Sequence, residues 1–342
     1  MKAPLITLPH IQEEALRVLV MRADADESCH EVDIALCDGE GQVILGMGQY
    51  ESVIYPRSAM KPLQALALLE LMEEKGITDI EEPELALFCA SHNGEDLHSE
   101  AVIKVLGKFD IDPDALICGA HWSLDQETLI HQVRSMSAPQ KSHNNCSGKH
   151  AGMLILAKLL TGSTSGYEAT HHACQQKILG VLEAMTGSDL TAYPIGIDGC
   201  GAPVYRAPLG NWARAFALFA SGGVLPPARE QACLRLRRAI ARYPDYIAGQ
   251  NRACSAVNHA FGEAITVKVG AEGVYSAAFH HLGLGLMLKT RDGSKRGAEV
   301  ALGAVIKMLG FDVPSSLQPY FAPDITNWAG TKVGQIRVDN LP

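Results

Sequence analysis

Ser58 and Lys61 lie three positions apart at the start of a segment with helical periodicity. Residues at this spacing on a helix face the same side, so the Lys61 amine can reach the Ser58 hydroxyl. A serine is a poor nucleophile until a base takes its proton, and a neutral lysine can act as that base. The spacing also arises by chance in unrelated chains, so this pair alone does not establish an active site.

Two further short motifs follow in the sequence. Ser91-His92-Asn93 comes after an apolar run and is equally typical of a turn. Lys268 precedes Gly270 on a predicted strand, where a lysine is usually solvated and a glycine marks a bend. The ordered set Ser-x-x-Lys, Ser-x-Asn and Lys-x-Gly resembles the motifs of serine β-lactamases and penicillin-binding proteins. This chain departs from that pattern in two ways. The gap between Lys61 and Ser91 is short, and the chain has no obvious counterpart of the glutamate that acts as the base for deacylation in such β-lactamases.

Two thiols form a third group of candidates. Cys146 precedes Lys149 by three positions at the start of a predicted helix, an environment that lowers the pKa of a thiol. Cys200 lies in a tight loop with Asp198. Thiolates are good zinc ligands, so a shared metal site is one interpretation. Because the chain has no Cys-x-x-Cys pair, the alternative is that both thiols are small apolar core side chains.

The elements that must position these residues change in character along the chain. Two alternating runs around the turn 38–41 predict a β-hairpin over 31–48, and three short runs over 264–290 predict a β-meander. Between and after them, helical periodicity predicts helices over about 58–75, 96–109, 148–161, 168–186, 227–242 and 293–310.

Strands at both ends of the chain and helices between them predict a mixed α/β (α+β) fold. The simplest arrangement is one antiparallel sheet built from both chain ends, with flanking helices and an inserted helical subdomain. We expect the sheet part to comprise 1–57 plus 255–342 and the helical part 58–254, together forming one compact unit. Such a sheet would bring residues near 58 and near 268 to the same crevice.

Composition narrows the functional class. The chain has 342 residues, 47% of them hydrophobic, and its net charge is 29 − 38 = −9. An acidic chain without a basic cluster argues against nucleic acid and anionic membranes as partners. No apolar run approaches about 18 residues, and the N-terminal stretch lacks the pattern of a signal peptide. The nine cysteines are irregularly spaced, so we expect reduced thiols and a cytoplasmic protein.

Longer motifs extend this interpretation. The runs PRSAMKPLQ (56–64), CASHNGE (89–95), HNNCSGKH (143–150), DGCGAP (198–203), AGQNR (248–252), KVGAEGVY (268–275) and LKTRDGSKR (288–296) resemble those of the Rhizobium etli-type L-asparaginases. The resemblance covers about residues 28–340.

The resemblance implies a β-lactamase-like fold, a homodimer, and hydrolysis of the side-chain amide of L-asparagine. It implies two Ser–Lys pairs, Ser58 with Lys61 and Ser91 with Lys268, in one site. It also implies a zinc ion that modulates substrate binding without activating the nucleophile. The implied metal ligands are Cys146, Lys149 and Cys200. Our candidates for substrate binding are Arg57, His92, Asn93, Asp198 and His150.

Two other functions stay open at this point. The same Ser–Lys residues could serve an amidohydrolase of glutamine, a short peptide or a β-lactam, because one methylene is worth only about 1–3 kcal/mol in a pocket. A non-enzymatic module that binds an amino acid or a metal is the other alternative. The presence of both serines and both lysines favours an enzyme.

Overall fold

The computed structural model describes residue 4 and residues 7–341, and the chain divides into two compact units. Unit 1 comprises Met1–Ala59, Ala207–Ser221 and Val269–Pro342; unit 2 comprises Met60–Arg206 and Gly222–Lys268. The division expected from the sequence assigned 207–221 to the helical part and set the second boundary at 254. Here that stretch belongs to the sheet unit, and the second boundary follows Lys268.

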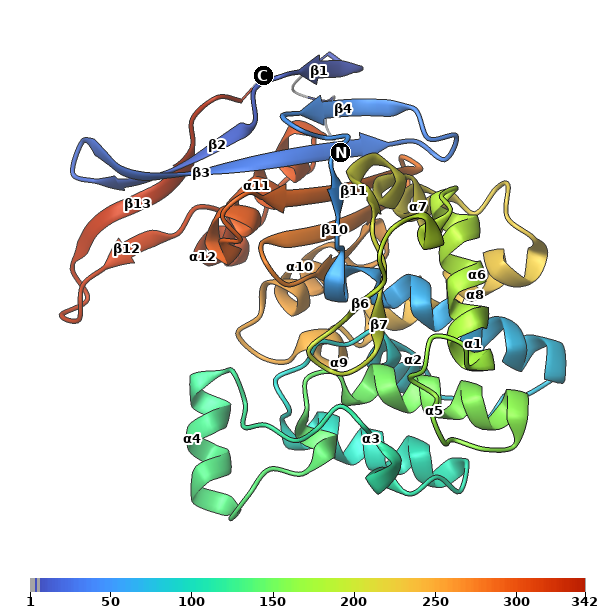
Figure 1. Ribbon diagram of the computed structural model, residues 1–342. Helices are drawn as coiled ribbons and strands as arrows, with labels where there is room; N and C mark the ends of the chain where they lie inside the picture. Colours follow the sequence, from blue (N-terminus) through green and yellow to red (C-terminus); the bar gives the residue numbers. More distant parts are fainter. Residues whose placement is uncertain (1–3, 5–6, 342) are drawn as a thin grey trace. The chain divides into compact units, whose positions relative to one another are not determined.

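Unit 1 is built around a mostly antiparallel sheet with the strand order β12-β13-β2-β3-β11-β10 (Figure 1). β4 pairs with β3 antiparallel and with β1 parallel. The C-terminal strand β13, red in Figure 1, lies against the N-terminal strand β2, drawn in blue. The strands are β1 (His10–Gln12), β2 (Leu16–Arg22), β3 (Ala25–Cys37), β4 (Val43–Met47), β10 (Val274–Phe279), β11 (Leu284–Thr290), β12 (Asp324–Thr326) and β13 (Lys332–Val338), with a short pair of β5 (Val53–Ile54) and β8 (Ala207–Pro208).

Two helices of unit 1 cover opposite faces of the central strands. On β11, a Cβ at Gly285 would collide with the backbone of α7 (Leu209–Ser221), whereas Thr290 contacts Gly297 of α11 (Lys295–Met308). Positions 285 and 290 differ by an odd number, so their side chains point to opposite faces. Burial on both faces explains why β3 and β11 are apolar at consecutive positions. The short helix α12 (Gln318–Phe321) packs on α11.

Unit 2 is mainly helical. Its helix α1 (Lys61–Lys75) is buried from Lys61 to Met72, as expected of a helix enclosed by others. Gly76 ends α1 in the left-handed conformation, with φ of 66°. The other elements are α2 (Glu82–Phe88), α3 (Asp96–Lys108), α4 (Gln126–Ser135), α5 (Ser147–Thr161), α6 (Ala173–Thr186), α8 (Pro227–Arg242), α9 (Asp245–Ala248) and α10 (Ala253–Phe261), with β6 (Gly196–Ile197), β7 (Pro203–Val204) and most of β9 (Ile265–Val269).

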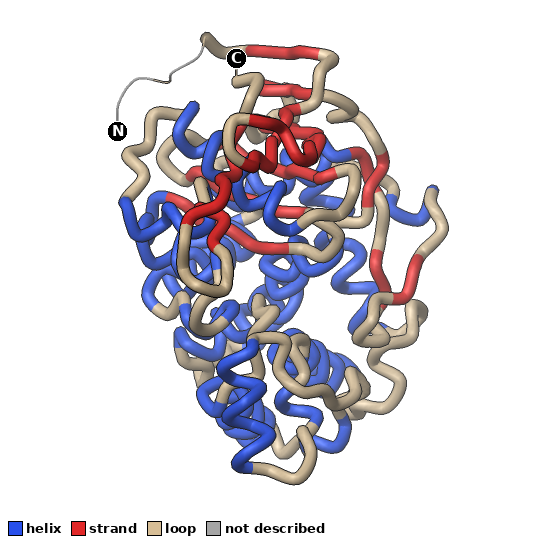
Figure 2. The backbone as a smooth tube through the Cα atoms, turned by 90° about the vertical axis from the view of Figure 1, so that its left-hand side faces the viewer, coloured by secondary structure: helices blue, strands red, loops and turns tan. Residues whose placement is uncertain are grey.

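The mixed α/β class is confirmed: Figure 2 shows both helices, in blue, and strands, in red. The antiparallel sheet that joins the two ends of the chain is also confirmed, because β13 pairs with β2 and β11 pairs with β3. Two helix starts differ from expectation. Ser58 lies in a 3-10 turn, Arg57–Met60, and α1 begins only at Lys61. The helix expected from 168 begins at Ala173, because His172 caps it by accepting a hydrogen bond from the Cys174 amide.

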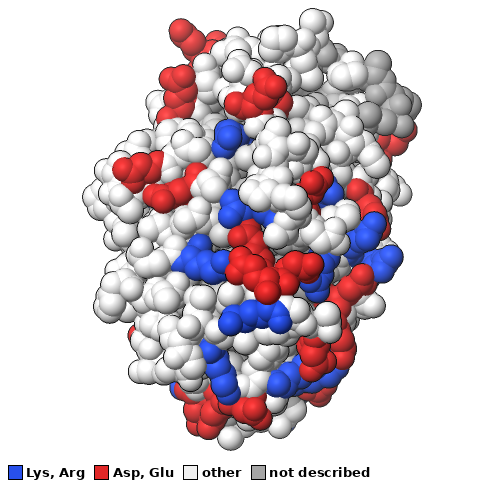
Figure 3. Space-filling view, turned by 90° about the vertical axis from the view of Figure 1, so that its right-hand side faces the viewer, with Lys and Arg blue, Asp and Glu red and all other residues white. Residues whose placement is uncertain are grey.

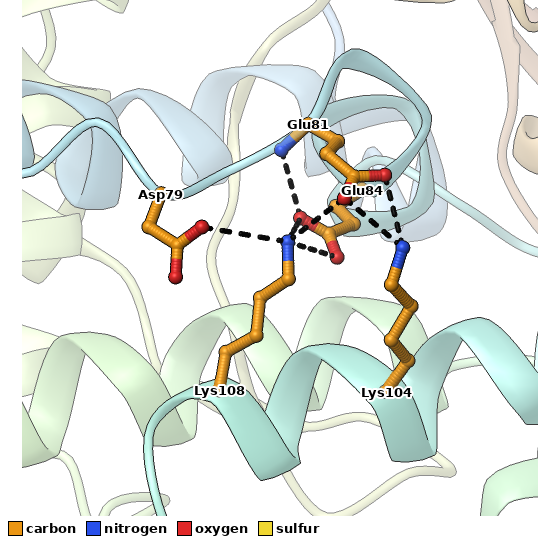
Figure 4. A network of polar contacts seen from close by, with 5 residues as sticks. All are labelled: Asp79, Glu81, Glu84, Lys104 and Lys108. Atoms are coloured by element: carbon orange, nitrogen blue, oxygen red, sulfur yellow. Dashed lines mark hydrogen bonds and ion pairs between the residues drawn. The ribbon is translucent and has the colours of Figure 1, made fainter.

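An ion-pair network joins α2 to α3 in unit 2 (Figure 4). The carboxylate of Glu84, 3% exposed, lies 2.9 Å from Lys108 Nζ, and Lys108 also reaches Glu81. Lys104 contacts Glu81 as well, but both side chains are more than half exposed. Only the Glu84–Lys108 pair therefore compensates a buried charge.

Removing Lys108 is expected to destabilise the protein. Lys108→Ala leaves the Glu84 carboxylate buried without its cation, which should cost about 1–3 kcal/mol of unfolding free energy. Lys104→Ala removes an exposed partner and should cost much less. Urea unfolding of both variants measures the difference, and equal losses would contradict this account of the network.

On the face seen in Figure 3, lysine and arginine side chains alternate with aspartate and glutamate. No helix in the described part of the chain has the length and apolarity needed to cross a membrane. All nine cysteines are free thiols.

Candidate active site

Two buried lysines of unit 2 meet at one serine hydroxyl. Lys61 Nζ donates to Ser91 Oγ at 2.8 Å, and Lys268 Nζ donates to the same oxygen at 2.9 Å. Lys61 is 1% exposed, Lys268 is fully buried, and Ser91 is 6% exposed. The three side chains come from α1, from the segment after α2, and from β9. The structure therefore brings together three of the four predicted catalytic residues.

The Lys61 amine has three acceptors for its donors. Besides Ser91 it contacts the Ala90 carbonyl oxygen at 2.6 Å and Cys146 Sγ at 3.2 Å. Three acceptors suit the three N–H groups of an ammonium. Lys61 thus connects the Ser–Lys cluster to the thiol cluster of the same unit.

Burial makes Lys268 unusual among lysines. It lowers the pKa of Lys268 to about 7, and the nearby charges of Lys61 and Arg252 act in the same direction, against the opposing thiols Cys254 and Cys146. Near neutral pH a large share of Lys268 is therefore uncharged, and its lone pair can accept the proton of the Ser91 hydroxyl.

Backbone hydrogen bonds hold the Ser91 segment. The amides of Ser91 and Asn93 donate to the carbonyls of Ile247 and Ala248, both at 2.9 Å, while the amide of His92 donates to Asn145 at 3.1 Å on the other side. These three hydrogen bonds hold the backbone of residues 91–93 between the carbonyls of residues 247–248 and that of Asn145.

Ser58 lies in unit 1, three residues before Lys61. It is half-buried and follows Arg57, whose φ of 52° is the left-handed conformation that non-glycine residues rarely adopt. In the same unit, a Cβ at Gly270 would lie 2.6 Å from the Pro56 carbonyl oxygen. The glycine of the Lys-x-Gly motif therefore permits a close approach to the segment that carries Ser58.

The predicted metal ligands converge in unit 2. Lys149 Nζ lies 2.9 Å from Cys200 Sγ, and Cys146 is held by Lys61 on its other side. A hydrogen bond from Cys200 and the charges of Lys61 and Lys149 lower the pKa of Cys146 well below its usual value, although burial opposes them. Among the residues described, no group of three or more His, Cys, Asp or Glu side chains could hold a metal. This trio has only two such residues and a lysine.

His150 lies beside this trio. Its Nδ1 contacts the Tyr167 hydroxyl at 2.7 Å, while its Nε2 is buried without a hydrogen-bond partner among the described residues. Burial, followed by the charge of Lys149, lowers the pKa of His150 to about 4, so the ring is neutral. Two thiols, one amine and a neutral imidazole are each zinc-binding groups in chemical type, although Cys146, Cys200 and His150 do not form a three-residue metal site within the described residues.

Of the predicted substrate-binding residues, His92 and Asn93 have their polar atoms occupied within the protein. His92 Nδ1 accepts from the Gly94 amide, and Nε2 lies 3.0 Å from Ser147 Oγ. The Asn93 side chain donates to Glu95 and to the Gln250 carbonyl, and accepts from Arg252. Asp198 lies in the turn after β6. Burial lowers the pKa of Lys149, but Cys200 and Cys146 raise it above its usual value, and the charge of Asp198 adds a smaller contribution in the same direction.

Sequence reasoning did not single out Arg252, the N-cap residue of α10, whose Nη1 donates to Asn93 Oδ1 at 2.7 Å. The only sequence signal was the run AGQNR, which places one cation three positions after Gly249. Without knowing that residues 247–248 pair with 91–93, nothing in the spacing connects position 252 to Ser91.

Comparison with known structures gives weak overall similarity. Mglu in its native form aligns with 14% identity and a TM-score of 0.41, covering 78% of this chain and 61% of that chain. Mglu in its glutamate form aligns with 14% identity and a TM-score of 0.42, covering 83% of this chain and 62% of that chain. A β-lactamase from Mycobacterium bovis aligns with 13% identity and a TM-score of 0.43, covering 82% of this chain and 95% of that chain. This chain thus spans about three-fifths of the length of Mglu. The β-lactamase-like fold stays a prediction.

The search of curated proteins found no match. A family model described as L-asparaginase II matches residues 18–338, nearly the whole chain. This match confirms the family resemblance of the motifs. The chain therefore belongs to the L-asparaginase II family.

Proposed function

We propose that this protein hydrolyses the side-chain amide of L-asparagine to L-aspartate and ammonia through an acyl-enzyme on Ser58. The observation that carries the proposal is the contact of Ser91 Oγ with two buried lysine amines. Such a cluster can move protons between buried groups. Amide hydrolysis requires this, because the departing nitrogen must be protonated. The family supplies the amidohydrolase class.

In the proposed mechanism, Ser58 Oγ attacks the amide carbon and forms the ester bond. The sequence suggested Lys61 as the base that takes the Ser58 proton. Because the Lys61 amine already donates to three acceptors, we propose that it also passes protons on to Ser91. We propose that Lys61 takes the proton of Ser58 and passes another to Ser91, which passes its own to neutral Lys268. The relay then returns a proton to the departing nitrogen as the C–N bond breaks, and ammonia leaves. Water subsequently cleaves the β-aspartyl ester.

The proposed zinc ligands are Cys146, Lys149 and Cys200, with His150 beside them. Zinc bound there would supply positive charge that neutralises the thiolates. The chain's own part is to orient the ligands: Tyr167 holds the His150 ring, and Lys61 holds Cys146. The homodimer and the cytoplasmic location implied earlier stay predictions.

Protein purified without chelator is expected to contain about one zinc per chain. The double variant Cys146→Ser, Cys200→Ser should lose it, because thiolates supply most of the affinity, and occupancy of the unaltered protein should fall at acid pH as the thiols protonate. Cys233→Ser, which alters a buried thiol on α8, is the control. Metal analysis decides, and full retention in the double variant would exclude these ligands.

The test of the proposed function is ammonia release from a panel of L-asparagine, L-glutamine and a short peptide amide, together with a chromogenic β-lactam. We expect the highest kcat/KM with L-asparagine. A higher value with L-glutamine or the β-lactam would assign the same residues to a different amidohydrolase. No turnover of any substrate would favour a binding module.

A further inference from the structure

We infer that Arg252 binds the α-carboxylate of the amino-acid substrate and that Asn93 positions it. The inference rests on the proposed asparaginase function and adds to it the residue that recognises the amino-acid end of the substrate. Neither the motifs nor the family match assigns a role to Arg252.

Arg252 contacts Asn93 in the same unit that holds Ser91 and the two lysines. Its Nη1 donates to Asn93 Oδ1 at 2.7 Å. Asn93 follows Ser91 by two positions, and the amides of both donate to the adjacent carbonyls of residues 247 and 248. The charge of Arg252 also acts on Lys268, whose amine contacts Ser91. The carboxylate and the amide of asparagine are joined through only two carbons, so a substrate whose amide meets the relay at Ser91 carries its carboxylate only a short way from that serine.

The orientation of Asn93 is determined by its other contacts. Its Nδ2 donates to Glu95 Oε1 at 3.0 Å and to the Gln250 carbonyl oxygen at 2.9 Å. Both amide hydrogens are thereby used, and only the oxygen faces Arg252. Glu95 Oε1 also accepts from the Gln250 amide, which fixes the carboxylate in turn. Asn93 is therefore a positioning residue, not a direct substrate ligand.

Arg252 forms no direct ion pair with a carboxylate in the described part of the chain, although Glu95 lies on the other side of the Asn93 amide. The hydrogen-bond acceptor of Arg252, Asn93, is a neutral amide, and the guanidinium is half-buried. A guanidinium has five N–H donors in a planar fork that matches a carboxylate. A half-buried arginine with one donor committed to a neutral partner can bind such an anion.

The positive charge extends to the serine–lysine cluster. Arg252 and Lys61 both contribute to the lowered pKa of Lys268, although burial is the larger cause. A substrate that carries an α-carboxylate would place a negative charge among these cations, whereas a simple amide would not. The arrangement thus favours amino-acid amides over neutral amides.

Binding to a non-turnover protein tests this role directly. In the Ser58→Ala background, calorimetry compares L-asparagine with β-alaninamide, which is asparagine without its α-carboxylate. We expect Arg252→Gln to weaken L-asparagine about 10- to 100-fold, as loss of a charged hydrogen bond does, and to leave β-alaninamide unchanged. Arg252→Lys should recover part of the affinity. Arg242→Gln, which alters a 57% exposed arginine of the same unit, is the control.

Kinetics of the variants with Ser58 intact provide a second readout. Arg252→Gln should raise KM for L-asparagine by a similar factor, change kcat less, and leave the thermal midpoint near that of the Arg242→Gln control. Equal affinity for L-asparagine with and without Arg252, or equal weakening of both ligands, would overturn the inference. Absence of ammonia release by the unaltered enzyme would instead refute the proposed function, while the binding comparison would still decide the role of Arg252.

Discussion

Ser58→Ala is expected to lower kcat for L-asparagine by about 10³-fold or more, since loss of a nucleophile removes the covalent route altogether. The substitution removes one oxygen from a half-buried side chain, so the fold and the affinity for L-asparagine should persist. Ammonia release under saturating substrate measures the loss. Ser135→Ala, at an exposed serine at the end of α4, should keep normal activity.

Comparing kcat of Ser58→Ala with that of Ser91→Ala decides which serine is the nucleophile. Ser91→Ala interrupts the relay between Lys61 and Lys268, but it leaves the proposed nucleophile in place. Its kcat should fall by about 10²- to 10⁴-fold, the range for lost proton transfer. Retention of more than a few per cent of kcat in Ser58→Ala, with complete loss in Ser91→Ala, would assign the nucleophile to Ser91.

The second large effect concerns Lys268. Its pKa of about 7 means that the neutral form grows as pH rises from 6 to 8 and is nearly complete at pH 8. Because the relay needs neutral Lys268, kcat/KM should rise over this interval with an apparent pKa near 7 and then level off.

Lys268→Met and Lys268→Arg separate proton transfer from packing. Methionine keeps most of the volume without a titrating group, and arginine keeps the charge without losing its proton. Both variants should lose about 10²- to 10⁴-fold in kcat. Lys104→Arg, at an exposed position of the same unit, is the matched control. A Lys268→Met enzyme with the activity and pH profile of the unaltered protein would contradict the relay.

Local sequence patterns predicted the elements well where periodicity and turns are strong. The hairpin of β3 and β4 and the helix α11 follow from alternation and from helical spacing. The strands β2 and β13 were not predicted individually, because their pairing joins residues more than 300 positions apart. The helix α7 joins the sheet unit through its packing on Gly285, which no local pattern indicates.

The same distinction holds for the site. The i, i+3 spacing of Ser58 and Lys61 suggested that both lie on one α-helix. Instead, Ser58 lies in a 3-10 turn, and α1 begins at Lys61. The contact of Lys61 with Cys146, 85 positions away, connects two clusters that the sequence presents separately. Arg252 illustrates the limit most clearly, since its relation to Ser91 depends on backbone pairing 156 positions along the chain.

The central claim is that a covalent aspartyl ester forms on Ser58. Mixing the enzyme with L-asparagine, quenching in acid within the first turnover, and measuring intact mass with peptide mapping tests it most directly. The account predicts an added aspartyl group on the peptide that contains Ser58, absent from Ser58→Ala and accumulating in step with the first equivalent of ammonia. Release of that ammonia without any adduct, or an adduct on the peptide that contains Ser91, would contradict it.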